Sequence, residues 1–259
     1  MSTPTESSAR PATSAPLLGF WYPATLATAV RPGKMSAQVL LGLPLLICRD
    51  SQGRLAALRD ICPHRGMPLS FGHFDGTILE CCYHGWQFDM EGPLQVDKIG
   101  VATYPCQERD GYVWVYLPDP SDKASAPPEV PRLPLLSERY RRLHLSTALR
   151  CAIDDGIVGL MDPAHGPFVH QSAWWRSRDS IHEKAKEFEP IPNGFRMKAH
   201  EPSRNSALYK LLGVYGERIT TTIDFVLPNL RYELVTCGPY WFSSRATVTS
   251  ITEQECRID

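Results

Sequence analysis

Four residues that can bind a transition metal occur in two short groups, each with one cysteine and one histidine. Cys62 and His64 lie two positions apart, 16 residues separate His64 from Cys81, and His84 lies three positions after Cys81. Thiolate sulfur and imidazole nitrogen are common ligands for zinc and for iron in proteins. The spacing therefore indicates a metal centre that takes one sulfur and one nitrogen from each of two loops.

This ligand set matches the Rieske type of [2Fe-2S] cluster, in which two thiolates bind one iron and two imidazoles bind the other. A Cys2His2 zinc site is the alternative, although zinc ligands more often occur as a pair of cysteines followed by a pair of histidines. Gly66 and Gly85 lie soon after the histidines and let the backbone turn tightly. We therefore predict a [2Fe-2S] cluster at these four residues, with a reduction potential between about −150 and +300 mV.

The second loop leaves one ligand ambiguous, because Cys82 also precedes His84. Cys82 and His84 repeat the Cys-x-His spacing of the first loop, whereas Cys81 and His84 have Cys-x-x-His spacing. The residues by themselves leave both cysteines as candidates. His73, between the two loops, is more typical of a hydrogen-bonding histidine in a surface turn than of a ligand.

The sequence CPHRG at 62–66, followed by C-x-Y-H-G-W-x-F-D at 81–89, resembles the Rieske domain of ring-hydroxylating oxygenase α subunits. GFWYP at 19–23 and FVLPN at 225–229 extend the resemblance over most of the chain. In that family the sulfur ligand of the second loop lies three residues before the histidine. The resemblance therefore implies Cys81 as the ligand.

A second motif, formed by Asp162, His165 and His170, resembles the D-x2-H-x4-H element of the same family. It implies that His165 and His170 bind a mononuclear Fe(II), because two imidazoles and a carboxylate form the facial triad of non-haem iron oxygenases. Histidines five positions apart diverge by about 140° on a regular helix. We therefore expect a distorted helix at Gly166 and Pro167, where proline removes a backbone hydrogen bond.

Asp162 has two interpretations. Because Pro163 follows it, Asp162 is a good N-cap with proline at the first helical position. The resemblance implies instead that Asp162 connects a cluster histidine of a neighbouring subunit to His165 and gives electrons a route. One residue can do both, and we adopt the bridging role as the prediction.

The sequence departs from the family pattern in two places. Gly159 stands where many relatives have Asn, three residues before Asp162. Family members also continue beyond this length and take their third iron ligand from a later helix, so we expect a catalytic domain that is incomplete at its C-terminal end. We assign no third ligand among the downstream carboxylates, which are Asp224, Glu233, Glu253, Glu255 and Asp259.

The elements that must position these residues fall into two groups. From Leu17 to Leu117, short β-like runs alternate with turn residues, which predicts a small antiparallel sandwich. Turns are expected at residues 50–53, 75–76 and 110–111. The expected strands include residues 39–48, 55–59, 77–79 and 112–116.

A proline-rich stretch predicts a boundary after the first group of strands, because proline opposes both helices and sheets. A helical segment around 154–170 and strand-like runs at 219–227, 232–236 and 245–251 follow it. We therefore predict an α+β fold, with an all-β iron–sulfur domain and then an antiparallel-sheet-plus-helix catalytic domain. The expected divisions are a disordered tail at 1–16, the iron–sulfur domain at 17–117, a linker at 118–137 and the catalytic domain at 138–259.

Composition narrows the choice of partners. With 27 basic and 28 acidic residues the net charge is −1, which gives no electrostatic reason to expect nucleic acid or an anionic membrane. No run approaches the ~20 apolar residues of a membrane helix, and the first 16 residues lack a signal core. We expect a soluble, cytoplasmic protein whose isolated cysteines are inert thiols, namely Cys48, Cys106, Cys151, Cys237 and Cys256.

The resemblance implies a terminal oxygenase. Electrons would come from NAD(P)H through a reductase or ferredoxin, O2 would be the co-substrate, and a small organic molecule would be hydroxylated or dealkylated. The family also implies a homotrimer. A Rieske electron-transfer protein without a functional oxygenase centre is the alternative, and the identity of the substrate cannot be read from these motifs.

Overall fold

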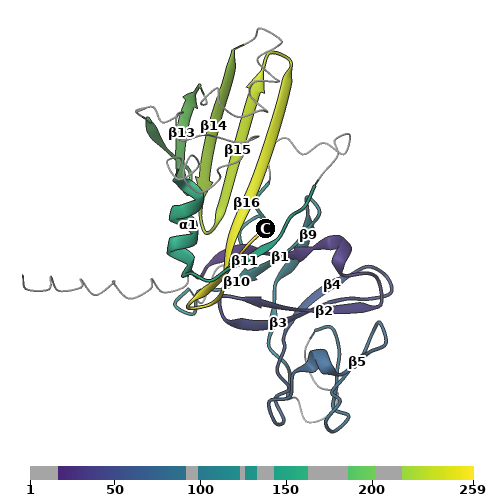
Figure 1. Ribbon diagram of the computed structural model, residues 1–259. Coiled ribbons are helices and arrows are strands. Elements are labelled where there is room, and N and C mark those ends of the chain that lie inside the picture. The colour runs from purple at the N-terminus through teal and green to yellow at the C-terminus, as the bar shows by residue number, and fades with distance from the viewer. Residues whose placement is uncertain (1–16, 92–98, 123–125, 133–142, 163–185, 202–217) are drawn as a thin grey trace, which may run out of the picture.

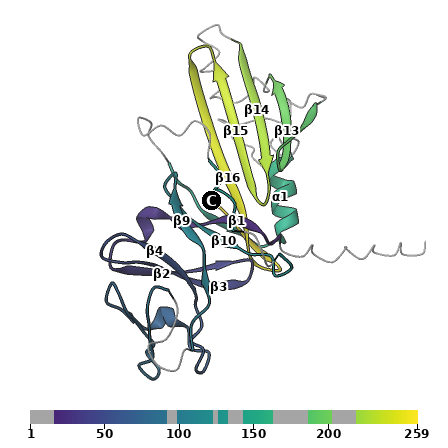
Figure 2. The ribbon, with the colours of Figure 1, turned by 180° about the vertical axis from the view of Figure 1, so that it is seen from behind.

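The computed structural model describes residues 17–91, 99–122, 126–132, 143–162, 186–201 and 218–259. An all-β part comes first, and a part built on one large antiparallel sheet with a helix comes second. Figures 1 and 2 show the long strands of the large sheet extending away from one side of the all-β part. The architecture is therefore α+β, as the sequence predicted.

Two antiparallel sheets pack against each other in the all-β part, with a shared core of aliphatic and aromatic side chains. Their strands are β1 Phe20–Leu26, β2 Lys34–Leu40, β3 Leu43–Arg49, β4 Leu55–Arg59, β8 Thr103–Tyr104, β9 Cys106–Arg109 and β10 Tyr112–Leu117, with a 3-10 turn, η1 Ala27–Ala29, after β1. The strand orders are β1-β10-β9 and β2-β3-β4-β8. The expected strands 55–59 and 112–116 are confirmed by β4 and β10.

Strand β3 is buried on both faces. Successive side chains of a strand point to opposite faces of its sheet. Leu45 and Ile47 accordingly belong to the core between the two sheets, while Leu46 and Cys48 belong to a second core on the other side. This explains the uninterrupted apolar run in β3, because both faces must exclude water.

A small three-stranded sheet covers the second core. Its strands are β5 His73–Phe74, β6 Leu79–Glu80 and β7 Gln87–Phe88, in that order, preceded by a 3-10 turn, η2 Leu69–Phe71. The expected run 77–79 overlaps β6 only at its last residue. The buried side chains contributed by these elements are Leu69, Phe74, Leu79 and Phe88.

The three expected turns are present, and each contains a residue with a positive φ angle. Gly53 has φ 90° and Gly76 has φ 99°, a backbone conformation that glycine adopts without strain. Asp110 and Gly111 both have positive φ, at 54° and 82°, which suits the two-residue hairpin between β9 and β10.

The expected strand at 39–48 is wrong, because it spans a hairpin. Leu41 and Gly42 have φ angles of 54° and 73°, so the chain reverses between β2 and β3. Leucine rarely adopts a positive φ, and the apolar sequence therefore concealed the turn. The partial burial of Leu41 against the sandwich core accounts for an apolar residue at this position.

Seven antiparallel strands form the large sheet of the second part. They are β11 Thr147–Leu149, β12 Phe188–Ile191, β13 Gly194–His200, β14 Ile219–Val226, β15 Leu230–Cys237, β16 Tyr240–Thr252 and β17 Glu255–Ile258. Their order is β11-β17-β16-β15-β14-β13-β12. The expected runs at 219–227, 232–236 and 245–251 correspond to β14, β15 and β16.

The helix of the second part, α1 Ile153–Met161, packs against β16 and β17. It ends at Asp162, which has extended backbone angles of φ −74° and ψ 111° and donates its N–H to the Val158 carbonyl at 2.8 Å. A residue before proline is pushed out of the helical region, and Pro163 follows. The expectation of one helical segment over 154–170 is therefore wrong at Asp162. Among the described residues, no helix is long and apolar enough to cross a membrane.

Hydrogen bonds and packed side chains connect the two parts of the molecule. The Leu41 N–H, at the tip of the β2–β3 hairpin, donates to the Ser250 carbonyl of β16 at 2.9 Å. In the segment that connects the two parts, the Pro128 carbonyl accepts a hydrogen bond from the Trp21 indole at 2.7 Å. Val130 of the same segment is 2% exposed and packs beside Trp21. The proline-rich segment is thus packed against the all-β part where it is described.

Candidate metal centre

The first predicted ligand loop connects β4 to η2 and carries Cys62 and His64. The Cys62 N–H donates to the Met67 carbonyl at 2.8 Å, and the Gly66 N–H donates to the Cys62 carbonyl at 2.9 Å. Gly66 has a φ angle of 74°, which allows the chain to close this turn. The loop is therefore a closed frame of six residues, 62–67, that begins at the cysteine.

The second loop connects β6 to β7 and has the same frame. The Cys81 N–H donates to the Trp86 carbonyl at 2.8 Å, and the Gly85 N–H donates to the Cys81 carbonyl at 2.9 Å. Gly85 has a φ angle of 69°. Cys81 is therefore the structural equivalent of Cys62, although the histidine lies one position later in this loop.

Burial separates the two adjacent cysteines of the second loop. Cys81 is 2% exposed and packs in the second core, as does Cys62, also at 2%. Cys82 is exposed. Geometry and burial thus favour Cys81 over Cys82, the alternative that the residue spacing left open.

Like side chains from the two loops are paired with each other. The His64 and His84 rings have centroids 4.6 Å apart at an interplanar angle of 64°. Burial raises the pKa of the Cys62 thiol, and the neighbouring Cys81 thiol raises it further. The loops each supply one cysteine and one histidine, yet the fold places sulfur beside sulfur and imidazole beside imidazole.

This pairing fits a Rieske cluster, which binds two thiolates on one iron and two imidazoles on the other. A tetrahedral zinc site would need its ligands around a single point. Across the described ranges, no three Cys, His, Asp or Glu side chains are grouped closely enough to hold one metal ion. The pairing of thiol with thiol and imidazole with imidazole is the arrangement that the cluster requires.

Aromatic rings surround the histidine side of the centre. The Trp86 ring stacks on His64, with centroids 4.4 Å apart and planes within 5°, and Tyr83 lies 4.0 Å from His84. The pKa of His64 is lowered, first by burial and then by the neighbouring charges of His84 and Arg65. A lowered pKa favours the neutral imidazole, which is the form that binds metal.

Asp60 supports the first loop and was not identified from the sequence. It is 6% exposed, and its carboxylate accepts hydrogen bonds from the Ser70 N–H and hydroxyl, both at 2.7 Å. Its own N–H donates to the Pro44 carbonyl of β3 at 3.0 Å. Asp60 therefore ties the chain just before Cys62 to both η2 and β3. An acidic residue two positions before a ligand was the available signal.

The second predicted site lies mostly outside the described residues. Asp162 is partly buried at the end of α1, whereas His165 and His170 fall in the range 163–185, which is not described. His73 is exposed on β5, as expected for a histidine at the surface.

Several downstream carboxylates are already engaged in ion pairs. Asp224 pairs with Arg196 through two contacts of 2.7 and 2.8 Å. Glu233 accepts from Arg231 at 3.0 Å, and Asp259 accepts from Arg257 at 2.7 Å. Structural pairing is sufficient to explain these three carboxylates.

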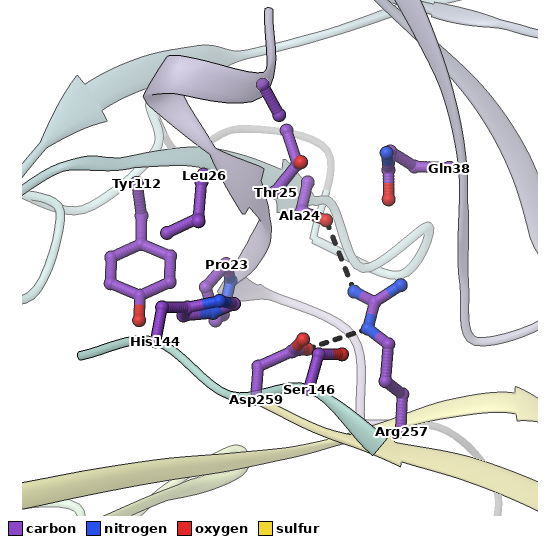
Figure 3. A pocket seen from close by; sticks show the side chains of 11 residues that line it. Pro23, Ala24, Thr25, Leu26, Gln38, Tyr112, His144, Ser146, Arg257 and Asp259 are labelled. Atoms are coloured by element: carbon purple, nitrogen blue, oxygen red, sulfur yellow. Dashed lines mark hydrogen bonds and ion pairs between the residues drawn. The ribbon is translucent and has the colours of Figure 1, made fainter. Parts of the chain in front are cut away.

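A cavity of about 200 Å³ lies at the junction of the two parts, away from the ligand loops. Figure 3 shows Tyr112 and His144 on one side of it and the Arg257 guanidinium on the other. Arg257 donates to Asp259 at 2.7 Å and to the Ala24 carbonyl at 3.3 Å. None of the predicted site residues that the structure describes lines this cavity, which is therefore separate from the two ligand loops.

A search against known families matches residues 20–105 to the Rieske [2Fe-2S] domain. The chain is 32% identical over 169 residues to chlorophyllide a oxygenase of Chlamydomonas reinhardtii, covering 62% of this chain and 25% of that protein. It is 32% identical over 171 residues to the oxygenase component of chloroacetanilide N-alkylformylase of Rhizorhabdus wittichii, covering 59% of this chain and 46% of that one. The chain thus spans less than half the length of these curated relatives.

Solved structures show the same fold over nearly the whole chain. Dicamba monooxygenase bound to dicamba superimposes with a TM-score of 0.78 at 24% identity, covering 95% of this chain and 77% of that one. The match includes the large sheet as well as the all-β part, since the latter accounts for less than half of the residues covered. Residues 20–105 thus match the Rieske [2Fe-2S] domain, the chain has the fold of dicamba monooxygenase, and its sequence relatives include the two oxygenases named above.

Proposed function

We propose that the chain is the terminal component of a Rieske oxygenase, which receives electrons at the [2Fe-2S] cluster and uses O2 to hydroxylate or dealkylate a hydrophobic organic substrate. The observation that supports this most is the pairing of thiol with thiol and imidazole with imidazole, in a chain whose second part also has the oxygenase fold.

Cys62 and Cys81 would hold one iron of the cluster, and His64 and His84 the other. When bound, the cluster accepts and passes on single electrons. The cysteines lie in an apolar core that excludes water, whereas His84 is exposed at the protein surface. The exposed imidazole gives an electron-transfer partner close access, and the buried thiols protect the sulfur ligands.

For the oxygenase centre we propose His165 and His170 as ligands of a mononuclear Fe(II), with Asp162 connecting them to a cluster histidine of a neighbouring subunit. Asp162 supports this role through its position, because α1 ends there and delivers its carboxylate directly before the two histidines in the chain. A neighbouring subunit is required by the bridging role, and we propose a homotrimer on the family resemblance.

We further propose that NAD(P)H supplies electrons through a reductase or ferredoxin and that the protein is cytoplasmic. None of the eight cysteines, all of which are described, forms a disulfide, which suits a reducing compartment. The relatives include a monooxygenase crystallised with dicamba and an N-alkylformylase component that acts on chloroacetanilides. A small aromatic molecule is accordingly the substrate class we propose.

The second candidate function is electron transfer by the Rieske cluster without a functional oxygenase centre. We retain this candidate because the chain matches less than half the length of these two relatives. It differs from the first in one measurable respect, since reoxidation of the reduced cluster by O2 would then not depend on Asp162, His165 or mononuclear iron.

A single-turnover experiment tests the proposal. The protein is loaded with Fe(II), reduced chemically, and mixed with O2 and aromatic substrates such as dicamba, while cluster absorbance and products are followed. We expect substrate-dependent reoxidation with oxygen from O2 in the product, and at least a hundredfold slower reoxidation in Asp162→Ala. Asp154→Asn, at an exposed acid on the same helix, is the matched control and should behave as wild type.

Equal reoxidation rates in wild type and Asp162→Ala, with no product, would support the electron-transfer function instead. A role of Asp162 as a helix cap alone would lower stability by about 0.5 to 2 kcal/mol and leave the rate per folded molecule unchanged. Measuring both the rate and the free energy of unfolding separates these outcomes.

A further inference from the structure

Two thiols meet where α1 packs against β16 and β17 of the large sheet. The Cys151 Sγ and Cys256 Sγ atoms lie 3.6 Å apart, although 105 positions separate the residues in the chain. Cys256 is fully buried, and Cys151 is partly exposed. Neither thiol belongs to the metal centre, and the sequence analysis assigned them no role.

The strand register brings the thiols together. Strands β11 and β17 pair so that Leu149 lies opposite Cys256. Beyond Leu149 the chain bends at Arg150 and Cys151, and this bend places the Cys151 thiol 3.6 Å from the Cys256 thiol. Helix α1 begins two residues later, at Ile153, and holds the end of this segment in place.

Gly156 shows how closely the helix approaches the thiols. A Cβ atom at this position would lie 2.8 Å from Cys256 Sγ and 2.9 Å from Val248 Cγ1, both closer than packed atoms allow. A Cβ atom at this position would also lie 3.9 Å from Cys151 Sγ. Glycine, which is less favourable than alanine inside a helix, therefore lets α1 approach both thiols closely.

We propose that Cys151 and Cys256 form a reversible disulfide by exchange with a small-molecule disulfide of the glutathione class. In the first step the Cys151 thiolate attacks glutathione disulfide, forms a mixed disulfide and releases one glutathione thiolate. In the second step the Cys256 sulfur displaces the second glutathione from Cys151, and the proton of the Cys256 thiol passes to the departing glutathione thiolate. Two protein thiols are oxidised, and one glutathione disulfide is reduced to two glutathiones.

The order of these steps follows from exposure. Burial raises the pKa of the Cys256 thiol to about 12, so the partly exposed Cys151 is the entry point for the oxidant. Closing the bond requires the sulfurs to move from 3.6 Å to about 2.05 Å, a change that small side-chain rotations can supply. The new bond would attach the start of α1 to β17, and α1 ends at Asp162.

The test uses the purified holoprotein in glutathione buffers of increasing oxidising ratio. Acid stops the exchange, the remaining thiols are then alkylated in denaturant at neutral pH, and peptides are mapped by mass spectrometry without reduction. We expect a linked peptide pair containing Cys151 and Cys256, reversed by dithiothreitol, while Cys237 remains alkylated. Because the bond closes a loop of about 100 residues, we expect the thermal midpoint of the oxidised protein to rise by about 5 to 10 °C.

Two variants complete the design. Cys151→Ser should show neither the linked peptides nor the rise in thermal midpoint, whereas Cys106→Ser, at a partly exposed cysteine in the other part of the molecule, should show both. Peptide mapping of the wild type stands independently of either variant. Absence of the link at every ratio, or a stable mixed disulfide at Cys151, would overturn the proposal.

Discussion

The loops at Cys62 and Cys81 have one backbone frame and two different histidine positions. In each loop the cysteine N–H donates to the carbonyl five residues later, and its carbonyl accepts from a glycine N–H four residues later. The histidine lies two positions after Cys62 but three after Cys81. The shared frame, rather than the distance to the histidine, therefore supports Cys81 as the proposed ligand.

The largest expected effect tests this frame directly. Cys81→Ser should abolish the cluster, because Cys81 is the buried equivalent of Cys62, whereas Cys82→Ser should retain it. Iron, acid-labile sulfide and the visible spectrum of both proteins provide the measurement. A cluster that survives Cys81→Ser and is lost in Cys82→Ser would reassign the ligand and end the equivalence of the loops.

The next largest effect is expected at the proposed mononuclear iron site, which is compared with the cluster in the other part of the molecule. His165→Ala and His170→Ala should each remove mononuclear iron and leave the cluster spectrum intact, because the ligands that we propose for the two centres are different residues. Metal analysis after reconstitution with Fe(II), together with the cluster absorbance, gives the answer. Loss of both centres in either variant would show that these histidines maintain the fold of the chain.

A smaller effect is expected at Asp60, which only the first loop possesses. Asp60→Ala removes the acceptor of two hydrogen bonds from Ser70, each 2.7 Å long, in a buried setting. We expect the free energy of unfolding to fall by about 1 to 3 kcal/mol, with faster loss of cluster. Asp75→Ala, at an exposed turn carboxylate, is the control and should have a smaller effect. Equal losses of unfolding free energy in Asp60→Ala and Asp75→Ala would contradict the role of Asp60 in supporting the first loop.

The smallest effect should be the same in both loops. Gly66→Ala and Gly85→Ala place a side chain at φ 74° and 69°, where no atom would contact the new Cβ within 4 Å. Backbone strain alone should cost about 1 to 2 kcal/mol in each variant. Gly159→Ala in α1, also without a contact within 4 Å, should instead be neutral or stabilising. Clearly unequal losses at Gly66 and Gly85, measured by denaturation, would break the equivalence of the frames.

Much of the Rieske domain could be predicted from the sequence, because its ligands and turns are marked by local residue types. Cysteine, histidine and glycine occur at fixed offsets, and the turns at 50–53, 75–76 and 110–111 contain glycine after a polar residue. The β2–β3 hairpin was missed because Leu41 adopts a positive φ against its preference. Tertiary contacts of Leu41 with the sandwich core outweigh that local preference.

Features that depend on contacts between distant segments were not predictable in this way. The choice between Cys81 and Cys82 needed the family resemblance, since burial and the backbone frame are visible only in the folded chain. The Asp60 carboxylate meets Ser70 through the η2 turn, and Cys151 meets Cys256 through the register of β11 and β17. Helix α1 ended earlier than expected at Asp162, where the effect of Pro163 on its neighbour was underestimated.

The pairing of two thiols and two imidazoles on a [2Fe-2S] cluster is most directly tested by pulsed EPR of the reduced protein carrying 15N-labelled histidine. Two histidine nitrogens should couple to the reduced cluster, and His64→Ala and His84→Ala should each disrupt that signal. A reduced cluster without coupled histidine nitrogen, or a colourless protein that binds only zinc, would contradict the assignment of Cys62, His64, Cys81 and His84.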